Sequence, residues 1–154
     1  MITLKEGDKA PAFRGVDQDG QPVSLKEYRG KKMILFFYPE ADSPTCTVES
    51  CNLRDNYTKL TRAGFEVIGV SPDSPQRQHK FQQKYKLPYR LVADEENRIT
   101  MAYGTRDWKK MFGHEYMGIL RTTFVIDEKG IIRKIFLRPR SKMHAEEILA
   151  AMQA

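Results

Sequence analysis

The sequence predicts an α/β fold in which a central mixed β-sheet is covered by helices on both faces. Short apolar runs, typical of strands buried on both faces, alternate along the chain with segments of helical periodicity. This alternation indicates parallel crossovers, whereas two adjacent strands near the C-terminal end, joined by a glycine-containing turn, indicate an antiparallel hairpin. The 154 residues, 40% hydrophobic and 30% charged, suit one domain spanning residues 1–154.

The expected elements follow one another from residue 32 onwards. The apolar run KMILFFY at 32–38 predicts a strand that Pro39 ends, and helical periodicity at 43–62 stops at Gly64. The remaining expected elements are strands at 65–70, 90–93, 121–126 and 131–137 and helices at 76–86, 95–103 and 144–152. This order is the thioredoxin-like arrangement, in which ligands lie beyond the carboxyl ends of the strands. The loop from Pro39 to Thr45 is therefore the expected position of a site.

Composition and charge restrict the classes of function. The net charge is +6, but most basic residues are interleaved with acidic ones, which favours a solvated surface over a nucleic-acid interface. The positive charge would attract small anions or an acidic protein partner. The longest clearly apolar run has six residues (33–38), far below the roughly 20 of a membrane-spanning helix. Because the N-terminal segment is charged and has no apolar signal core, we expect a cytoplasmic protein that binds neither nucleic acid nor membrane.

Cys46 is the first candidate for chemistry. Ser43 followed by Pro44 predicts a helix start, because a serine hydroxyl can accept a hydrogen bond from a backbone N–H two or three residues on and proline needs no donor at the first position. Cys46 then lies in the first turn, where free N–H groups and the helix dipole favour a thiolate. Leu53 and Leu60, seven and fourteen positions on, share its face, so we expect Cys46 to point into a pocket at the strand end.

Cys51 lies five positions after Cys46, about 140° round the helix, and is expected to be outward or half-buried. In an intact helix the Cα atoms of such a pair are about 8.6 Å apart, whereas a disulfide needs less than about 7 Å. A disulfide between the two cysteines would therefore require the first turns to unwind. The alternative is that both are small core residues.

Metal binding fits the sequence poorly. C-x4-C on a helix does not converge as C-x2-C does, and the three histidines, His79, His114 and His144, are scattered and each expected at the surface. Arg121 is a stronger candidate, because it begins the apolar strand RTTFVID and would bring a guanidinium beside a buried sheet. If it reaches Cys46, it would hold the thiolate and bind an oxygen-bearing substrate; otherwise it extends to solvent at the sheet edge.

Residues 37–55, FYPEADSPTCTVESCNLRD, resemble the peroxiredoxin active-site signature P-x-x-x-(T/S)-x-x-C, with Pro39, Ser43 and Cys46 in its three positions. The C-x4-C spacing is similar to that of the peroxiredoxin Q subfamily, also called bacterioferritin comigratory protein. The resemblance continues through GDKAPAF, DQDGQPVSLKEYRGKK, GVSPDSP, KMFGHEYMGILRTTFVIDEKG and HAEEILAAM, nearly the whole chain.

The resemblance implies a role for each site residue. Cys46 would be the peroxidatic cysteine, attacking a hydroperoxide and becoming a sulfenic acid, and Cys51 the resolving cysteine that forms an intrachain disulfide with it. Pro39 would shield the sulfur from water, and Ser43 would hydrogen-bond the thiolate or the peroxide. Arg121 would stabilise the thiolate and the oxygen on which charge develops.

The implied activity is a thiol-dependent peroxidase that reduces hydrogen peroxide and organic hydroperoxides without any cofactor or metal. A thioredoxin- or glutaredoxin-type reductant would restore both thiols, and the protein would be a monomer or weak homodimer. A disulfide oxidoreductase would normally show C-x2-C at the helix start. The alternative of another class is a thioredoxin-fold binding or chaperone module with structural cysteines.

Three positions depart from the family pattern or have a second explanation. Thr45 stands where many relatives have glycine, which adds bulk beside the nucleophile. Arg106 is near the position of a tryptophan common in relatives, and Trp108 comes two residues later, so a pocket-wall role for Trp108 is doubtful. Glu49 matches an acidic or amide position in relatives, but an exposed first-turn glutamate that favours the helix dipole explains it equally well.

Overall fold

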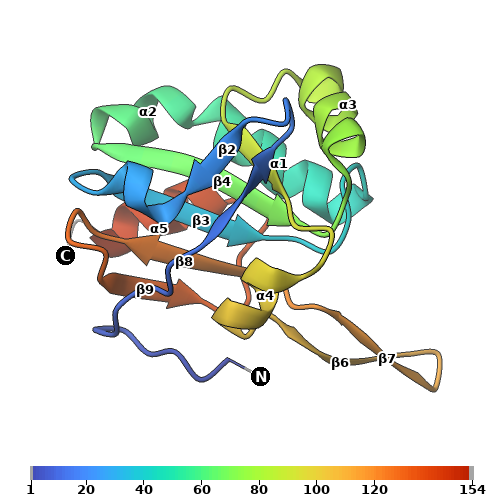
Figure 1. Ribbon diagram of the computed structural model, residues 1–154. Coiled ribbons are helices and arrows are strands. Elements are labelled where there is room, and N and C mark those ends of the chain that lie inside the picture. Colours follow the sequence, from blue (N-terminus) through green and yellow to red (C-terminus); the bar gives the residue numbers. More distant parts are fainter. Residues whose placement is uncertain (1, 153–154) are drawn as a thin grey trace.

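A computed structural model describes residues 2–152 and contains a seven-stranded mixed sheet (Figure 1). Its strand order is β2-β1-β5-β4-β3-β8-β9. The strands of this sheet are β1 (Arg14–Asp17), β2 (Pro22–Ser24), β3 (Lys32–Phe37), β4 (Phe65–Ser71), β5 (Arg90–Ala93), β8 (Thr122–Ile126) and β9 (Ile132–Phe136). The helices are η1 (Leu25–Tyr28, 3-10), α1 (Pro44–Asp55), α2 (Tyr57–Arg62), α3 (Pro75–Tyr85), α4 (Arg98–Tyr103) and α5 (His144–Met152).

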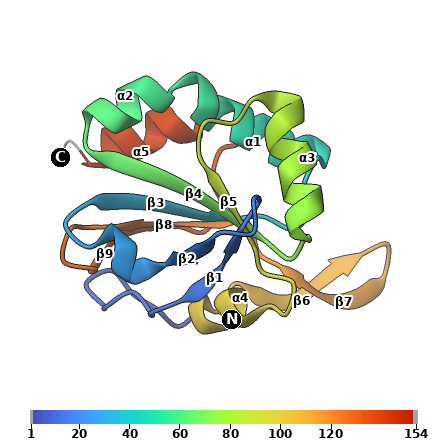
Figure 2. The same ribbon diagram turned by 45° about the horizontal axis from the view of Figure 1, so that its top comes forward.

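The sheet is covered on both faces, as the sequence predicts. Helices α1, α2, α3 and α5 lie on one face, whereas α4 lies on the other, as Figure 2 shows. The central strand β3 supplies side chains to both cores: Ile34 and Phe36 pack on the first face, and Met33 and Leu35 on the second. Because both its faces are buried, β3 is apolar without interruption. The thioredoxin-like expectation is confirmed.

Strand pairing brings distant parts of the chain to one edge. β3 runs parallel to β4, and β4 to β5, whereas β8 is antiparallel to both β3 and β9. In the β3–β8 register, Phe37 is opposite Thr122 and Met33 is opposite Ile126. The carboxyl end of β3 therefore meets the beginning of β8, and the loops that follow and precede them form one surface.

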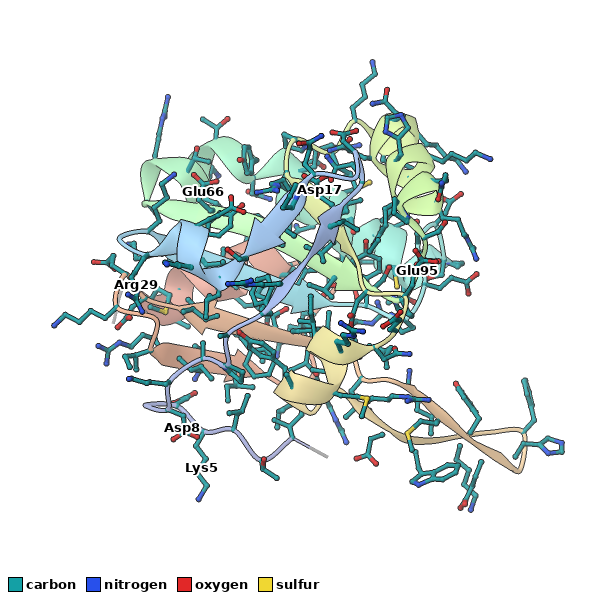
Figure 3. The ribbon with its side chains drawn as sticks, viewed as in Figure 1. Lys5, Asp8, Asp17, Arg29, Glu66 and Glu95 are labelled. Atoms are coloured by element: carbon teal, nitrogen blue, oxygen red, sulfur yellow. The ribbon has the colours of Figure 1, made fainter. Side chains whose placement is uncertain are left out.

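Two hairpins were not expected from the sequence. β1 and β2 form the first, and it reaches the sheet because β1 pairs with β5, more than 70 residues later. Asp17 of β1, labelled in Figure 3, accepts a hydrogen bond from Arg90 Nε at 2.9 Å. These strands are short and polar, so their sequence shows little alternation, and long-range pairing decides their conformation.

The second hairpin, β6 (Arg106–Met111) with β7 (His114–Ile119), is separate from the main sheet and projects from it (Figures 1 and 2). Its two-residue turn places Phe112 and Gly113 at φ of 52° and 80°, as a type I′ turn requires. Trp108 and Phe112 are 63% and 94% exposed. The hairpin buries little, which is why apolar periodicity did not reveal it.

The other expected elements are present with bounds that differ from the predicted ones by at most three residues. The helix expected at 43–62 is interrupted at Asn56, which ends α1 and precedes α2. Among residues 2–152, no helix has the length and apolar character that crossing a membrane requires.

Candidate active site

The loop after β3 places Cys46 in the first turn of α1. Ser43 has the extended conformation of an N-cap residue, Pro44 is the first helical residue, and the Thr47 N–H donates to the Ser43 carbonyl at 2.9 Å. The expected helix start is confirmed, but the expected capping bond is wrong. The Ser43 hydroxyl instead donates to the Glu40 carbonyl at 3.0 Å, because the tight turn before the helix brings that acceptor within reach.

Cys46 is fully buried and in contact with Arg121. The Arg121 Nη1 donates to the Cys46 Sγ at 3.0 Å, although the two residues are 75 positions apart. The β3–β8 register explains the contact, because Arg121 immediately precedes β8 at the edge where β3 ends. The contact brings a permanently charged guanidinium directly against the sulfur. Arg121 is half-buried and turned toward the sulfur.

Arg121 lines a cavity of about 630 Å³, whereas the fully buried Cys46, expected to point into a pocket, is not among its lining residues. Thr45 and Arg121 line it together with Lys109 of β6, a residue that the sequence did not single out. Burial lowers the pKa of Lys109, and the neighbouring Arg121 lowers it further, while Cys46 opposes the shift. The rest of the lining is Ile2, Leu120, Thr122, Leu137, Arg138, Pro139 and Ser141. The cavity lining therefore combines cationic side chains, Arg121, Lys109 and Arg138, with apolar ones such as Leu120 and Leu137.

Pro39 lies in a second, smaller hollow of about 260 Å³, which it shares with Lys109, Tyr116 and other residues of the hairpin. It is half-buried, between the end of β3 and the projecting β6–β7 hairpin. Trp108 lines neither hollow, which agrees with the doubt about a pocket-wall role.

Cys51 is half-buried on the same helix, as expected, and both cysteines are free thiols. Burial raises the pKa of the Cys51 thiol, with a smaller opposing effect of Arg54. α1 is continuous through both positions, so the structure shows the wound, unbridged form.

Glu49 is fully buried, so the expectation of an exposed first-turn glutamate is wrong. It lies three residues after Cys46, on the helix face that packs inward. Neither carboxylate oxygen has a hydrogen-bond partner. Burial raises the pKa of Glu49 to about 7; Arg121 lowers it and Glu147 raises it further. The i, i+3 spacing from Cys46 was the signal in the sequence that this residue shares the buried face.

His144 is also buried, although it was expected at the surface with the other histidines. Its Nε2 lies 2.8 Å from Thr123 Oγ1 of β8, and its Nδ1 lies 2.7 Å from Glu147. Burial lowers the pKa of His144, and Glu147 opposes that shift. The first turn of α5 packs on β8, which a local reading of HAEEILAAM does not show. His79 and His114 are exposed, as expected, and residues 2–152 contain no cluster of three or more potential metal ligands.

The fold and the buried cysteine paired with an arginine define a class of thioredoxin-like proteins that act through a reactive thiol. A family model described as AhpC/TSA family matches residues 6–135. The chain belongs to this family, in its peroxiredoxin Q or Bcp group, and its activity is that of a thiol peroxidase.

Named relatives are similar in sequence to this chain over nearly its full length. A putative peroxiredoxin bcp of Coxiella burnetii is 40% identical over 151 residues, which covers 98% of this chain and 100% of the relative. Peroxiredoxin Bcp of Bacillus subtilis is 38% identical over 152 residues, covering 99% and 97%. Among solved structures, peroxidoxin BcpB of Mycobacterium tuberculosis superposes with a TM-score of 0.86 at 30% identity, covering 97% of each chain. A cysteine-to-serine mutant of Xylella fastidiosa PrxQ reaches 0.92 at 23% identity, covering 99% and 98%, and shows the shared fold.

Proposed function

We propose that Cys46 is the peroxidatic cysteine, that Cys51 resolves its sulfenic acid as an intrachain disulfide, and that a thioredoxin-type reductant restores both thiols. The observation that supports this most directly is the 3.0 Å contact between Arg121 Nη1 and Cys46 Sγ. It places a fixed positive charge where a thiolate must persist and where charge develops on the leaving oxygen.

In the first step, the Cys46 thiolate attacks the terminal oxygen of a hydroperoxide. The S–O bond forms as the O–O bond breaks, so the sulfur is oxidised to sulfenic acid, and the leaving alkoxide or hydroxide takes a proton to become alcohol or water. Arg121 stabilises the negative charge before and during this transfer. The adjoining cavity has room for the organic group of an alkyl hydroperoxide as well as for hydrogen peroxide itself.

Pro39 and Ser43 have supporting roles. Pro39 covers the sulfur from bulk water. The single Ser43 proton is held by the Glu40 carbonyl, so while that bond lasts Ser43 acts on the substrate as an acceptor of the hydroperoxide O–H rather than as a donor to the thiolate.

In the second step, the Cys51 sulfur attacks the Cys46 sulfenic acid, the S–S bond forms and water leaves. Since the wound helix keeps an i, i+5 pair too far apart, α1 must unwind around Cys46 before this step. A thioredoxin- or glutaredoxin-type dithiol then exchanges with the disulfide. Both thiols start each cycle reduced, which suits a reducing compartment such as the cytoplasm, and a monomer or weak homodimer without metal or cofactor suffices.

The test is a single-turnover experiment. Fully reduced protein is mixed with one equivalent of hydrogen peroxide in a rapid-mixing instrument and quenched, and free thiols and intact mass are measured. We expect loss of both thiols within seconds and a mass about 2 Da lower, as for loss of two hydrogens in a disulfide. Cys51→Ser should consume one equivalent and stop at the sulfenic acid, whereas Cys46→Ser should react with none. Full turnover by Cys46→Ser would contradict the proposal.

A second candidate, a binding or chaperone module with structural cysteines, is favoured by one observation, the exposed Trp108 and Phe112 on the projecting hairpin. The same experiment separates the two. A binding module would keep both thiols for hours after peroxide addition, and Cys46→Ser would leave its binding unchanged.

A further inference from the structure

The segment between the two cysteines contains an unusual concentration of unpartnered polar atoms. Within residues 2–152, four buried side-chain oxygens have no hydrogen-bond partner: Thr47 Oγ1, both carboxylate oxygens of Glu49 and Ser50 Oγ. Folded proteins pair nearly all buried polar atoms, because an unpaired one loses its bonds to water and gains none in return. All four would regain water if residues 46–51 unwound.

The remainder of α1 is held firmly. Asn52 Oδ1 accepts from the Ala145 N–H at 2.8 Å, and Asn52 Nδ2 donates to the Lys142 carbonyl at 2.9 Å, which fastens the helix to α5. Leu53 is fully buried in the core, and Arg54 Nη1 donates to the Tyr85 carbonyl at 2.8 Å. The unpartnered oxygens therefore all lie before Asn52, on the side of this attachment where the helix has to open.

Glu49 is the charged member of this segment, and three titratable groups from other elements interact with it. Arg121, before β8, attracts its carboxylate, whereas Glu147 of α5 repels it. Tyr89, which precedes β5, interacts electrostatically with Glu49 and donates its hydroxyl to the Ser50 carbonyl at 2.8 Å. Opening must break this bond as well as the contact of Arg121 with Cys46. No cation bonds directly to Glu49 among the described residues, so the wound helix tolerates its neutral form better than its ionised form.

We propose that Glu49 is a positioning residue for the resolving step: its ionisation unwinds residues 46–51 and lets Cys51 reach the Cys46 sulfenic acid. The role in resolution rests on the function proposed above, but the unwinding itself does not. The three unpartnered side chains lower the stability of the wound segment at every pH, and Glu49 makes that stability depend on pH.

The direction of the pH dependence follows from linkage. Burial raises the pKa of Glu49 from its ordinary 4.5 to about 7 in the wound form. The wound form thus binds the proton more tightly than the unwound form. The part of its stability that depends on the Glu49 proton is full below pH 4.5 and is lost as the pH rises to about 7. Over that range the equilibrium constant for opening rises by up to tenfold per pH unit, and above it the constant changes little.

Hydrogen exchange of the reduced protein, without peroxide, tests the unwinding. Amide exchange at residues 47–51 is compared between the natural protein and Glu49→Gln from pH 5 to pH 8, as a ratio that cancels the intrinsic pH dependence. We expect the natural protein to exchange at least tenfold faster at pH 7.5 and about fivefold faster or less at pH 5. The control Glu95→Gln changes an exposed glutamate, labelled in Figure 3, and should give a ratio of one throughout. A ratio for Glu49→Gln that does not change with pH would overturn the proposal.

A second variant separates the effect of the Glu49 charge from the effect of a buried polar atom that lacks a hydrogen bond. Ser50→Ala removes one unpartnered oxygen without changing charge, so it should slow exchange at residues 47–51 severalfold by the same factor at every pH. Faster exchange in Ser50→Ala would contradict the view that these oxygens weaken the wound helix.

Disulfide formation after one equivalent of peroxide then tests the link to chemistry. The rate in Glu49→Gln should fall at least tenfold below that of the natural protein at pH 7.5 and approach it at pH 5. An equal rate at both pH values would overturn the role in resolution. If exchange behaves as expected but no disulfide forms in either protein, the unwinding stands and it is the proposed function that fails.

A separate observation lies at the opposite end of the sheet. A cavity of about 570 Å³ opens between η1, the segment around Ala10 and the β8–β9 turn. Its floor includes the buried Met33 and Ile126, which face each other at the end of β3 and β8 remote from Cys46, and Leu25 and Tyr28 are half-buried in its wall. Five cations surround it: Lys9, Lys26, Arg29, Lys31 and Lys129. Arg29 is labelled at the edge of the molecule in Figure 3.

The side chains of these cations are not paired with acidic groups in the part of the chain that the structure describes. Within the part of the chain that the structure describes, none of the five side chains forms a hydrogen bond or an ion pair. The lining acid, Asp127, already accepts from the backbone N–H groups of Lys129 and Ile131 and pairs with Arg133 at 2.6 Å. The geometry points to a binding site for a small anion with several negative charges and a planar ring, the chemistry of a nucleoside di- or triphosphate. The cations at the rim would bind the phosphates, and the half-buried Leu25 and Tyr28 of the wall would contact the ring.

Calorimetric titration with ATP, and with inorganic tripolyphosphate for comparison, tests this site. We expect ATP to bind at least tenfold more tightly than tripolyphosphate, because the ring adds apolar contact. Lys26→Glu combined with Lys31→Glu should weaken ATP binding at least tenfold, whereas Lys59→Glu combined with Arg62→Glu, the same charge change on exposed positions of α2, should have little effect. Equal weakening by both pairs, equal affinity for the two anions, or no binding of ATP would each refute the site.

Discussion

At the scale of single residues, the site depends on one electrostatic contact made inside the protein. Cys46 is fully buried, and burial alone disfavours a charged sulfur. The Arg121 guanidinium at 3.0 Å opposes that cost. Arg121 is itself held by its position before β8, so the contact is present before substrate arrives and requires no rearrangement during the reaction.

Replacement of Arg121 should therefore slow the first chemical step. A charge-assisted hydrogen bond contributes about 1.5–3 kcal/mol, so Arg121→Ala should reduce the rate of peroxide consumption about 10- to 100-fold. The rate in Arg121→Lys should lie between those of the natural protein and Arg121→Ala, since an ammonium keeps the charge but loses the planar geometry. The measurement is the second-order rate with hydrogen peroxide in a Cys51→Ser background, with Arg98→Ala as the surface control. An unaltered rate in Arg121→Ala would exclude this role.

At the scale of elements, the attachment of α1 to α5 decides where α1 is free to open. Asn52 joins the two helices by accepting from the Ala145 N–H and donating to the Lys142 carbonyl. Its acceptor role satisfies an N–H group of the first turn of α5 that has no partner within that helix. The amide thus acts as a cap for one helix and as an anchor for the other.

Loss of that amide should destabilise the protein and extend the opening. Asn52→Ala should lower the free energy of unfolding by about 1–2 kcal/mol, the usual cost of losing a cap. It should also increase hydrogen exchange beyond residue 51 toward Asn56. Urea denaturation measures the first effect, and the exposed Thr58→Ala on α2 is the control. If exchange beyond residue 51 stays protected, the buried Leu53 and the bond of Arg54 to the Tyr85 carbonyl suffice to anchor the helix.

The α5–β8 contact through His144 has its own pH dependence. Burial lowers the pKa of His144 from its ordinary 6.5, so the folded state favours the neutral ring. The stability that depends on this ring is complete above pH 6.5 and falls as pH falls below it, because the unfolded chain takes up the proton first. His144→Gln should cost about 1–3 kcal/mol at pH 7.5 through the partners left unpaired, and less at pH 5. Urea denaturation at the two pH values measures the difference, and His79→Gln, at an exposed position, should show neither effect.

At the scale of the whole molecule, two apolar cores, one on each face of the sheet, support the strand that leads to the site. β3 contributes to both cores, and its end carries the loop that leads to Cys46. Close packing across this sheet leaves little room for added volume. At Gly69 of β4, a Cβ atom would lie 2.9 Å from side-chain atoms of Leu91 and Phe36 and 3.0 Å from Tyr38.

Gly69→Ala should therefore destabilise the fold as a whole. Three crowded neighbours in a closed core predict a loss of about 1–3 kcal/mol, and Gly69→Ser should lose more because it adds an unpaired hydroxyl. Thermal denaturation measures both, and Ala102→Ser at an exposed position of α4 should change little. A wild-type melting temperature in Gly69→Ala would mean that the sheet shifts at low cost.

Much of the fold was predictable because the elements that carry the site have strong local signals. The apolar run at 32–38 and the Ser43-Pro44 start are explained by neighbouring residues alone, and the structure places both within a residue of expectation. β1, β2 and the β6–β7 hairpin were missed, because short polar strands take their conformation from partners that lie far along the chain or from a turn. Glu49 and His144 were expected at the surface because both side chains are polar, whereas packing of α1 and α5 on the sheet buries them.

The sequence by itself determined the helix start that holds Cys46, the five-residue spacing to Cys51 and the positions of strands β3, β4, β5, β8 and β9 along the chain, because each depends on residues within a few positions of one another. The tertiary structure alone decided three further properties: the contact of Arg121 with Cys46 across 75 positions, the burial of Glu49 without a partner, and the cations gathered round a cavity at the far end of the sheet. The physical reason is that strand register and packing bring together, or remove from water, groups whose chemistry depends on surroundings that are distant in the chain.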